Sequence, residues 1–96
     1  MQSIEAIKKK IAPIGKAYGI KRIFLFGSYA KGTANNDSDI DLLIEKGKPL
    51  SLIKLSGLRL EVEELFNIPV DIVTTTGIDD EFRKEIAGTE LLMYEE

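Results

Sequence analysis

Residues 26–44 read FGSYAKGTANNDSDIDLLI. A Gly-Ser pair directly follows an apolar run, and after a polar stretch the sequence alternates between acidic and apolar residues. Alternation with a period of two is typical of a β-strand, and glycine after an apolar run is typical of the end of one. The pattern therefore predicts a strand ending at Phe26, a turn of helix over 28–31, a loop over 33–38 and a second strand over 39–45.

The sequence before this segment predicts a helix. Isoleucines recur at helical spacing over 3–18, where Ser3 can cap the helix and Gly19 can end it. Pro13 lacks an amide donor and lies inside the periodic stretch, so a kink or a break is expected near Ala12.

The sequence after the segment continues the alternation of elements. We predict a long amphipathic helix over 50–66, a strand over 69–75, a final helix beginning at Asp79, and an edge element of undecided type over 91–94. The apolar stripe of the long helix consists of Leu52, Leu55, Leu58, Val62, Leu65 and Phe66. This order indicates one α/β (α+β) domain over 1–96, with a small mixed sheet of three to four strands and helices packed on it. Whether the first two strands are parallel or antiparallel stays open.

Composition limits the chemistry that the chain can perform. It has 96 residues, 13 basic and 16 acidic side chains, a net charge of -3, and neither cysteine nor histidine. The missing residue types exclude thiol catalysis, histidine-based triads and the common zinc sites, and the net charge argues against direct nucleic-acid binding. No apolar run suits a signal peptide or a membrane span, so we expect a cytoplasmic protein. Any catalysis would use carboxylates, lysines, hydroxyls, backbone amides or a hard metal ion.

Three aspartates are candidate metal ligands. Asp39 and Asp41 are two residues apart on a predicted strand, so their carboxylates project from the same face. At about 7 Å and an effective dielectric near 20, two such charges repel by roughly 2 kcal/mol, and a bound divalent cation reverses the sign. Asp71 is an acid in an otherwise apolar strand, and beside Asp41 it would complete a cluster able to hold two metal ions.

Gly27 and Ser28 supply a complementary phosphate site. Glycine at the exit of a strand lets a phosphate approach the backbone, while the amides of the following helix and the Ser28 hydroxyl can donate hydrogen bonds. A phosphate site that faces a metal cluster is what transfer of a nucleotidyl group from a triphosphate requires. The segment therefore predicts a metal-dependent nucleotidyltransferase.

The order Gly27-Ser28, ten intervening residues, Asp39-x-Asp41 and a later strand carrying Asp71 resembles the signature of the DNA polymerase β-type nucleotidyltransferase superfamily. The chain is similar to its smallest branch, the minimal nucleotidyltransferase (MNT) domain. This resemblance implies a polymerase β-like fold, with the three aspartates as catalytic ligands of two Mg²⁺ ions. It also implies that the Gly-Ser pair holds the triphosphate of ATP.

The resemblance implies further nucleotide contacts from Lys31 and Ser38. Members of the family often carry arginine where Lys31 stands. Lysine keeps the positive charge but lacks the bidentate geometry of a guanidinium group, so the sequence departs from the family pattern at this position.

Family members of this size resemble the antitoxins of HEPN/MNT toxin-antitoxin modules, which attach AMP from ATP to a tyrosine of a HEPN ribonuclease. The resemblance thus implies MgATP as substrate, a HEPN ribonuclease toxin as partner, and a homodimer or a hetero-oligomer. Two alternatives stay open: nucleotidyl transfer to a small hydroxylated molecule, and a noncatalytic antitoxin that binds its toxin. Ile53 and Leu60 lie opposite the main stripe of the long helix and are candidates for a partner contact.

Overall fold

A four-stranded mixed sheet organises the chain. The computed structural model describes residues 3–47, 49–74, 81, 84 and 88–96. Its strands are β1 (Ile20–Phe26), β2 (Ile40–Lys46), β3 (Val70–Thr74) and β4 (Leu91–Glu95). They lie in the order β3-β2-β1-β4, with β1 antiparallel to β2 and β4, and with β2 parallel to β3. The mixed sheet is as predicted, and the element of undecided type over 91–94 is β4, one of the two edge strands of the described sheet.

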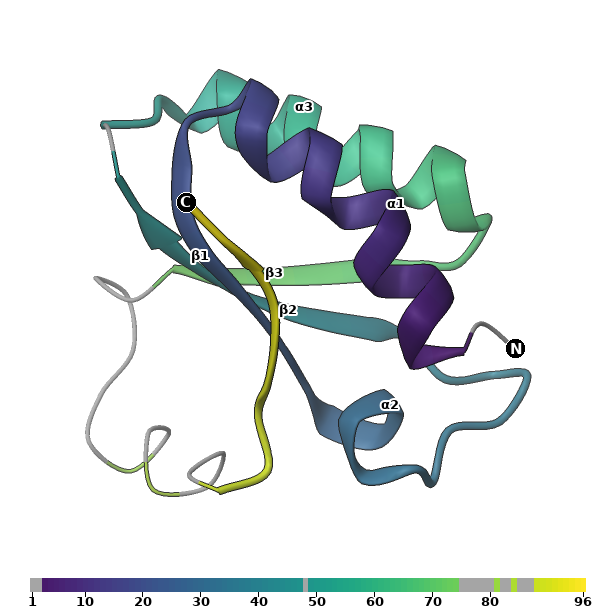
Figure 1. Cartoon of the computed structure of the whole chain (residues 1–96). Helices are drawn as coiled ribbons and strands as arrows, with labels where there is room; N and C mark the ends of the chain where they lie inside the picture. Colours follow the sequence, from purple (N-terminus) through teal and green to yellow (C-terminus); the bar gives the residue numbers. More distant parts are fainter. Residues whose placement is uncertain (1–2, 48, 75–80, 82–83, 85–87) are drawn as a thin grey trace.

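Two long helices cover one face of this sheet. The helices are α1 (Ile4–Ala17), α2 (Gly27–Lys31) and α3 (Leu52–Phe66). Figure 1 shows α1 and α3 together above the sheet, while the short α2 follows the end of β1. The long α3 connects β2 to β3, as a parallel strand pair requires. Among the described residues, none of the helices has both the length and the apolar character needed to cross a membrane.

Serine hydroxyls cap the N-termini of both long helices. Ser3 Oγ accepts a hydrogen bond from the Ala6 amide at 3.1 Å, and Ser51 Oγ accepts one from the Lys54 amide at 3.2 Å. Each bond satisfies an amide that has no partner within its helix. The predicted cap at Ser3 is therefore confirmed.

The break expected near Ala12 does not occur, because α1 runs continuously through Pro13. Proline at this position cannot donate to the carbonyl of Lys9, one turn earlier. Both Pro13 and Lys9 are exposed, so water can satisfy that carbonyl without interrupting the helix. The final helix predicted from Asp79 lies outside the described residues.

The main core fills the space between the sheet and the two long helices. Its largest fully buried side chains are Ile7, Ile11, Ile20, Ile23, Leu25, Ile40, Leu42, Ile44, Leu58, Val62 and Val70. The predicted stripe of α3 is wrong at Leu52, which is 82% exposed, and at Leu65, which is 45% exposed. Leu52 belongs to the first turn of α3, beside the C-terminal end of the edge strand β3, where no further strand of the described sheet lies beneath it. Ile53 and Leu60 are exposed, as predicted.

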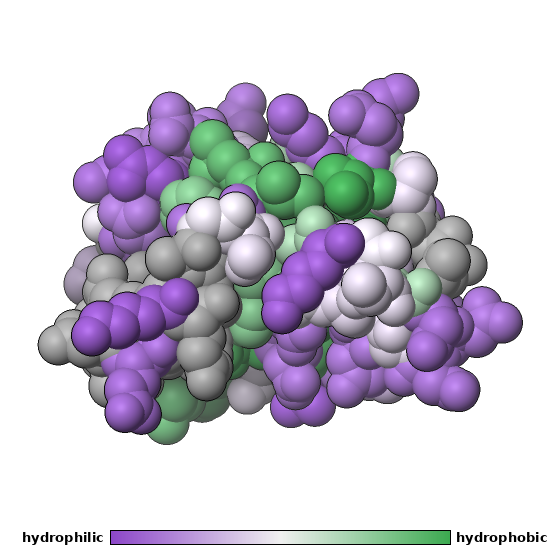
Figure 2. Space-filling model, turned by 90° about the horizontal axis from the view of Figure 1, so that it is seen from below, coloured by the Kyte–Doolittle hydropathy of each residue, from purple (hydrophilic) through white to green (hydrophobic). Residues whose placement is uncertain are grey.

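The opposite face of the sheet carries a second, smaller apolar cluster. Phe26 and Leu43 are its buried members, and Phe24 and Val73 pack against them. Figure 2 looks at the molecule from below the sheet and shows a band of apolar surface in the upper central part of this view, with hydrophilic side chains around it. This face therefore combines an apolar floor with polar margins.

Arg22 links three strands on this same face. Its Nε donates to Glu95 Oε2 on β4 at 3.0 Å, and its Nη1 donates to Glu45 on β2 at 3.0 to 3.1 Å. These residues are register partners across the sheet. The Arg22 guanidinium therefore fixes the lateral alignment of the strands at the end away from Phe26.

Two glycines inside helices should respond oppositely to alanine. A Cβ at Gly15 would lie 2.6 Å from Cδ2 and 2.8 Å from Cγ of Tyr94, whereas at Gly57 the nearest atom is the Tyr18 hydroxyl at 3.4 Å. Gly57→Ala gains helix stability of roughly 0.5–1 kcal/mol, while Gly15→Ala must displace the Tyr94 ring at a cost of about 1–3 kcal/mol. We expect thermal unfolding to move to higher temperature for Gly57→Ala and to lower temperature for Gly15→Ala. Equal shifts would show that α1 does not pack this closely on β4.

Candidate active site

Three neighbouring strands bring predicted site residues to one end of the sheet. Phe26 at the end of β1 is the register partner of Asp41 on β2, and Asp41 is the register partner of Asp71 on β3. All three side chains project from the face opposite α1 and α3, because Leu25 and Ile40, which alternate with them, lie in the main core. The expectation that Asp71 lies beside Asp41 on the sheet is thus confirmed.

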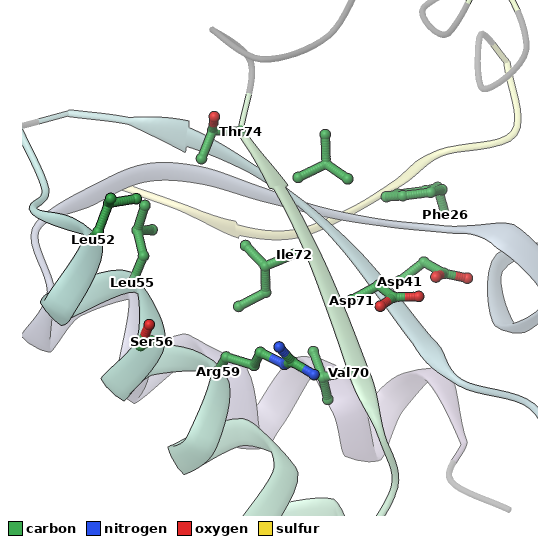
Figure 3. Close-up of a pocket in the computed structure, with 11 residues that line it drawn as sticks. Phe26, Asp41, Leu52, Leu55, Ser56, Arg59, Val70, Asp71, Ile72 and Thr74 are labelled. Atoms are coloured by element: carbon green, nitrogen blue, oxygen red, sulfur yellow. The ribbon is translucent and has the colours of Figure 1, made fainter.

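Asp41 is the half-buried member of the carboxylate pair. Burial, followed by the negative charges of Asp71 and Asp39 and a hydrogen bond with Asp71, raises the pKa of Asp41 from 3.8 to about 6. Asp71 is exposed. Figure 3 shows the two carboxyl groups side by side. A cation placed between them would remove the repulsion that raises this pKa.

Asp41 and Asp71 alone suit a magnesium ion better than the three predicted aspartates together do. In the part of the chain that the structure describes, no three carboxyl groups converge closely enough to hold a metal ion. Asp39 is exposed and directly precedes β2, while Asp41 and Asp71 are adjacent. Mg²⁺ in nucleotide-dependent enzymes commonly takes one or two carboxylates together with phosphate oxygens and water. Asp41 and Asp71 would hold such an ion, and Asp39 stays a predicted ligand.

Gly27 places the backbone against the Asp41 carboxylate. Its φ is 74°, and a Cβ added to it would collide with Asp41 Oδ2. Both observations require glycine at this position. No side chain caps the start of α2, which begins at Gly27 and continues with the half-buried Ser28. The amides at this helix start and the Ser28 hydroxyl are placed to meet an anion beside the carboxylates.

The loop before β2 is held by its own polar side chains. Ser38 Oγ accepts a hydrogen bond from the Asn35 amide at 2.9 Å, and Asn35 Oδ1 accepts one from the Asp37 amide at 2.8 Å. These bonds fix the approach of the chain to Asp39. The nucleotide contacts predicted for Ser38 and for Lys31, which is exposed in the last turn of α2, stay predictions.

A pocket of about 540 Å³ joins the carboxylate pair to α3. Figure 3 shows Asp41, Asp71 and Phe26 on one side of β3, and the α3 side chains on the other. The α3 residues that line the pocket are Leu52, Leu55, Ser56 and Arg59. Sequence reasoning missed this group because it assigned the two leucines to the core. The helical spacing of 52, 55, 56 and 59 was the signal that could have found it.

Arg59 is the cation among the described residues that line this pocket. Its Nε donates to Glu63 Oε1 at 3.0 Å, and the same Glu63 oxygen accepts a hydrogen bond from the Val70 amide at 3.3 Å. The first residue of β3 is thereby tied to α3. Arg59 therefore lies at the junction of the helix and the edge strand.

Comparison with known proteins identifies the family to which the chain belongs. The model of the family described as "Nucleotidyltransferase domain" matches residues 4–91, so the chain belongs to this family and is a nucleotidyltransferase. A relative in Methanocaldococcus jannaschii, provisionally named protein adenylyltransferase MJ0435, is 43% identical over 76 residues, which is 79% of this chain and 82% of the relative. Protein adenylyltransferase MntA of Thermococcus cleftensis is 31% identical over 86 residues, covering 90% of this chain and 85% of the relative.

A solved structure shares the fold. It contains a tri-AMPylated HEPN toxin of Shewanella oneidensis in complex with an MNT antitoxin. The match has a TM-score of 0.74 at 18% identity and covers 97% of this chain and 73% of that chain. The minimal nucleotidyltransferase fold that the family resemblance implies is therefore confirmed.

The pKa of Asp41 predicts how stability depends on pH. In the folded protein this pKa is about 6, above its ordinary value of 3.8. The folded protein thus binds the proton more tightly than the unfolded chain, and the contribution of Asp41 to stability falls as pH rises from about 4 to about 6. Asp41→Asn should stabilise the metal-free protein at pH 7 by the order of 1 kcal/mol, after allowance for solvent screening, and have little effect near pH 4.

Chemical denaturation of both proteins across this pH range measures the effect. Mg²⁺ at pH 7 should stabilise the wild type and have little effect on Asp41→Asn, because binding to the folded state alone raises stability. A difference between the two proteins that is the same at pH 4 and pH 7 would contradict the pKa assigned to Asp41.

Comparing Gly27→Ala with Gly32→Ala separates the effect of backbone strain from the effect of contact with the Asp41 carboxylate. Both glycines have a positive φ, 74° and 75°, but a Cβ at Gly32 has nothing within 4 Å. Alanine should cost about 1–2 kcal/mol of backbone strain at either position. Gly27→Ala should in addition displace the Asp41 carboxylate and abolish stabilisation by Mg²⁺, which Gly32→Ala should retain. Thermal unfolding with and without Mg²⁺ checks this, and equal Mg²⁺ responses would refute the close approach.

Proposed function

We propose that this chain transfers AMP from MgATP to a tyrosine hydroxyl of a HEPN ribonuclease from the same genome and thereby silences it as an antitoxin. The observation that carries the proposal is the Asp41–Asp71 pair beside the uncapped start of α2. Two relatives that are at least 31% identical are named protein adenylyltransferases, and the solved complex pairs an MNT antitoxin with an AMPylated HEPN toxin. The site and its relatives therefore support the same reaction.

Gly27 and Ser28 hold the outer phosphates of ATP through backbone amides and the hydroxyl. Asp41 and Asp71, with Asp39 as the remaining predicted ligand, would hold the magnesium ions. When bound, Mg²⁺ would neutralise the triphosphate and lower the pKa of the attacking hydroxyl, so no histidine base would be required. The chain's own residues thus position the α-phosphate between the start of α2 and the edge strand β3.

The transfer balances without a further reactant. The tyrosine oxygen forms a bond to the α-phosphorus, and the bond from that phosphorus to the bridging oxygen of pyrophosphate breaks. The hydroxyl proton, whose pKa bound Mg²⁺ would lower, is released to solvent. The products are an AMP-tyrosine ester and pyrophosphate.

Intact-mass spectrometry of the HEPN protein, incubated with this chain and MgATP, tests the proposal. We expect one or more additions of AMP mass with the wild type. Asp41→Asn should slow the addition by more than about 100-fold, since even residues outside the direct ligands of a metal can contribute that much. Asp37→Asn is the matched control, because Asp37 is an exposed acid of the loop before β2.

Three outcomes would contradict the proposal. A HEPN protein that is bound and silenced without a gain in mass would show a noncatalytic antitoxin. AMP transfer to a small hydroxylated molecule, with the HEPN protein unmodified, would show an enzyme of different specificity. Full transfer by Asp41→Asn would place the catalytic metal elsewhere.

A further inference from the structure

The pocket continues around the outer edge of β3 into a groove against α3. We call this part the edge groove and define it by Leu52, Leu55, Ser56, Arg59 and Ile72. In the described sheet β3 is an outermost strand, so the groove lies beyond the last paired strand. Figure 3 shows Ile72 directed toward the α3 side chains, on the side of β3 opposite the carboxyl pair. The edge groove is therefore continuous with the active site but separate from its metal ligands.

The geometry of phosphoryl transfer indicates from which edge of the sheet the acceptor hydroxyl approaches. In an in-line displacement the attacking and leaving oxygens lie on opposite sides of the phosphorus. The proposed triphosphate site is at Gly27 and Ser28, at the end of β1, and the carboxylates follow on β2 and then on β3. Pyrophosphate thus leaves on the β1 side. The attacking hydroxyl must arrive from the β3 side, where the edge groove begins.

We propose that the edge groove binds the segment of the partner protein that carries the acceptor hydroxyl. This inference rests on the proposed function and adds the surface by which the protein substrate is recognised. A residue seated in the groove lies on the far side of β3 from the carboxylates, so its hydroxyl must be carried on a long side chain that reaches around the strand. Tyrosine meets that requirement, whereas serine and threonine do not.

The groove also indicates the chemistry of the flanking residues. Leu52, Leu55 and Ile72 offer apolar contacts, and Leu52 is 82% exposed in the isolated chain. Arg59 uses its Nε on Glu63, and its guanidinium lies along the groove next to Val70 (Figure 3). The acceptor segment is therefore expected to place apolar side chains on the leucines and a carboxylate near Arg59.

The backbone of β3 can hold the segment in an extended conformation. The Val70 amide points away from β2, as its hydrogen bond to Glu63 shows. Backbone groups two residues further along a strand point in the same direction, so the amide and carbonyl of Ile72 also face the edge groove. A segment lying along this edge can pair with β3 as an added strand.

Leu52→Glu and Ile53→Glu form a matched pair for the test. These neighbours occupy the first turn of α3 and are 82% and 84% exposed, so neither substitution removes a core side chain. Only Leu52 lines the edge groove, so the pair also decides between this groove and the partner contact that the sequence suggests at Ile53. With the HEPN protein and MgATP, Leu52→Glu should raise the KM for the HEPN protein at least about tenfold, and Ile53→Glu should stay within about twofold of the wild type. The thermal shift with MgATP confirms that each variant is folded.

A second substitution tests the charge. Arg59→Ala should raise the KM for the HEPN protein, and Arg59→Lys should restore part of the loss. A rise in the KM for ATP instead would show that the edge groove holds the nucleotide, and would overturn the proposal. Equal effects of Leu52→Glu and Ile53→Glu, or wild-type kinetics for Leu52→Glu, would overturn it as well.

Binding of the HEPN protein, measured by calorimetry without ATP, separates the two proposals. If the wild type transfers AMP and both glutamate variants bind the HEPN protein as the wild type does, the edge groove is not the docking surface, while the proposed function stands. The wild type could also transfer no AMP, while Leu52→Glu weakens binding of the HEPN protein and Ile53→Glu does not. In that case the docking surface stands without the reaction. If the wild type neither binds nor modifies the HEPN protein, both proposals fail.

Discussion

The contact between the Gly27 backbone and the Asp41 carboxylate is the constraint on which the site depends. Antiparallel pairing of β1 and β2 places Phe26 opposite Asp41, so the next residue of the chain must turn beside that carboxylate. Only glycine adopts the required φ of 74° there and leaves room for the oxygen. The turn starts α2 at this point, and the proposed phosphate site therefore lies next to the proposed metal ligand Asp41. The parallel pairing of β2 with β3 then adds Asp71.

One face of the sheet packs the main core, and the other face carries the carboxylates of the candidate active site. The face under α1 and α3 holds the large apolar side chains, and their burial supplies most of the folding free energy. The other face has a smaller apolar cluster and carries the carboxylates, while the ion pairs of Arg22 with Glu45 and Glu95 hold the strands in register away from the site. Charges that repel one another can therefore collect at one end of the sheet without opening the core.

Local patterns in the sequence predicted much of this arrangement, and long-range pairing decided the rest. Alternation placed Asp41 on a strand, and the cap at Ser3 marked a helix start, because both depend on neighbouring residues. The direction of β2 relative to β1 depends on which strands pair, and periodicity does not encode it. The sequence analysis was wrong about the core position of Leu52 because helical spacing cannot show where the sheet beneath a helix ends. Arg59 was missed for the same reason, since its role depends on the edge of β3.

The two paired carboxylates differ in burial according to the strand that carries them. Asp41, on the inner strand β2, is half-buried and has its pKa raised to about 6, whereas Asp71, on the edge strand β3, is exposed. An inner strand is hydrogen-bonded on both sides and holds its side chains rigidly, so the unfavourable charge lies where the ligand geometry is best defined. Proteins commonly retain such destabilised groups where function requires them. In the described sheet, β3 is paired on one side only, which leaves its outer edge to the incoming chain that we propose. Asp41 and the proposed phosphate site thus lie at the inner strands of the sheet, whereas Asp71 and the proposed acceptor groove lie at its edge.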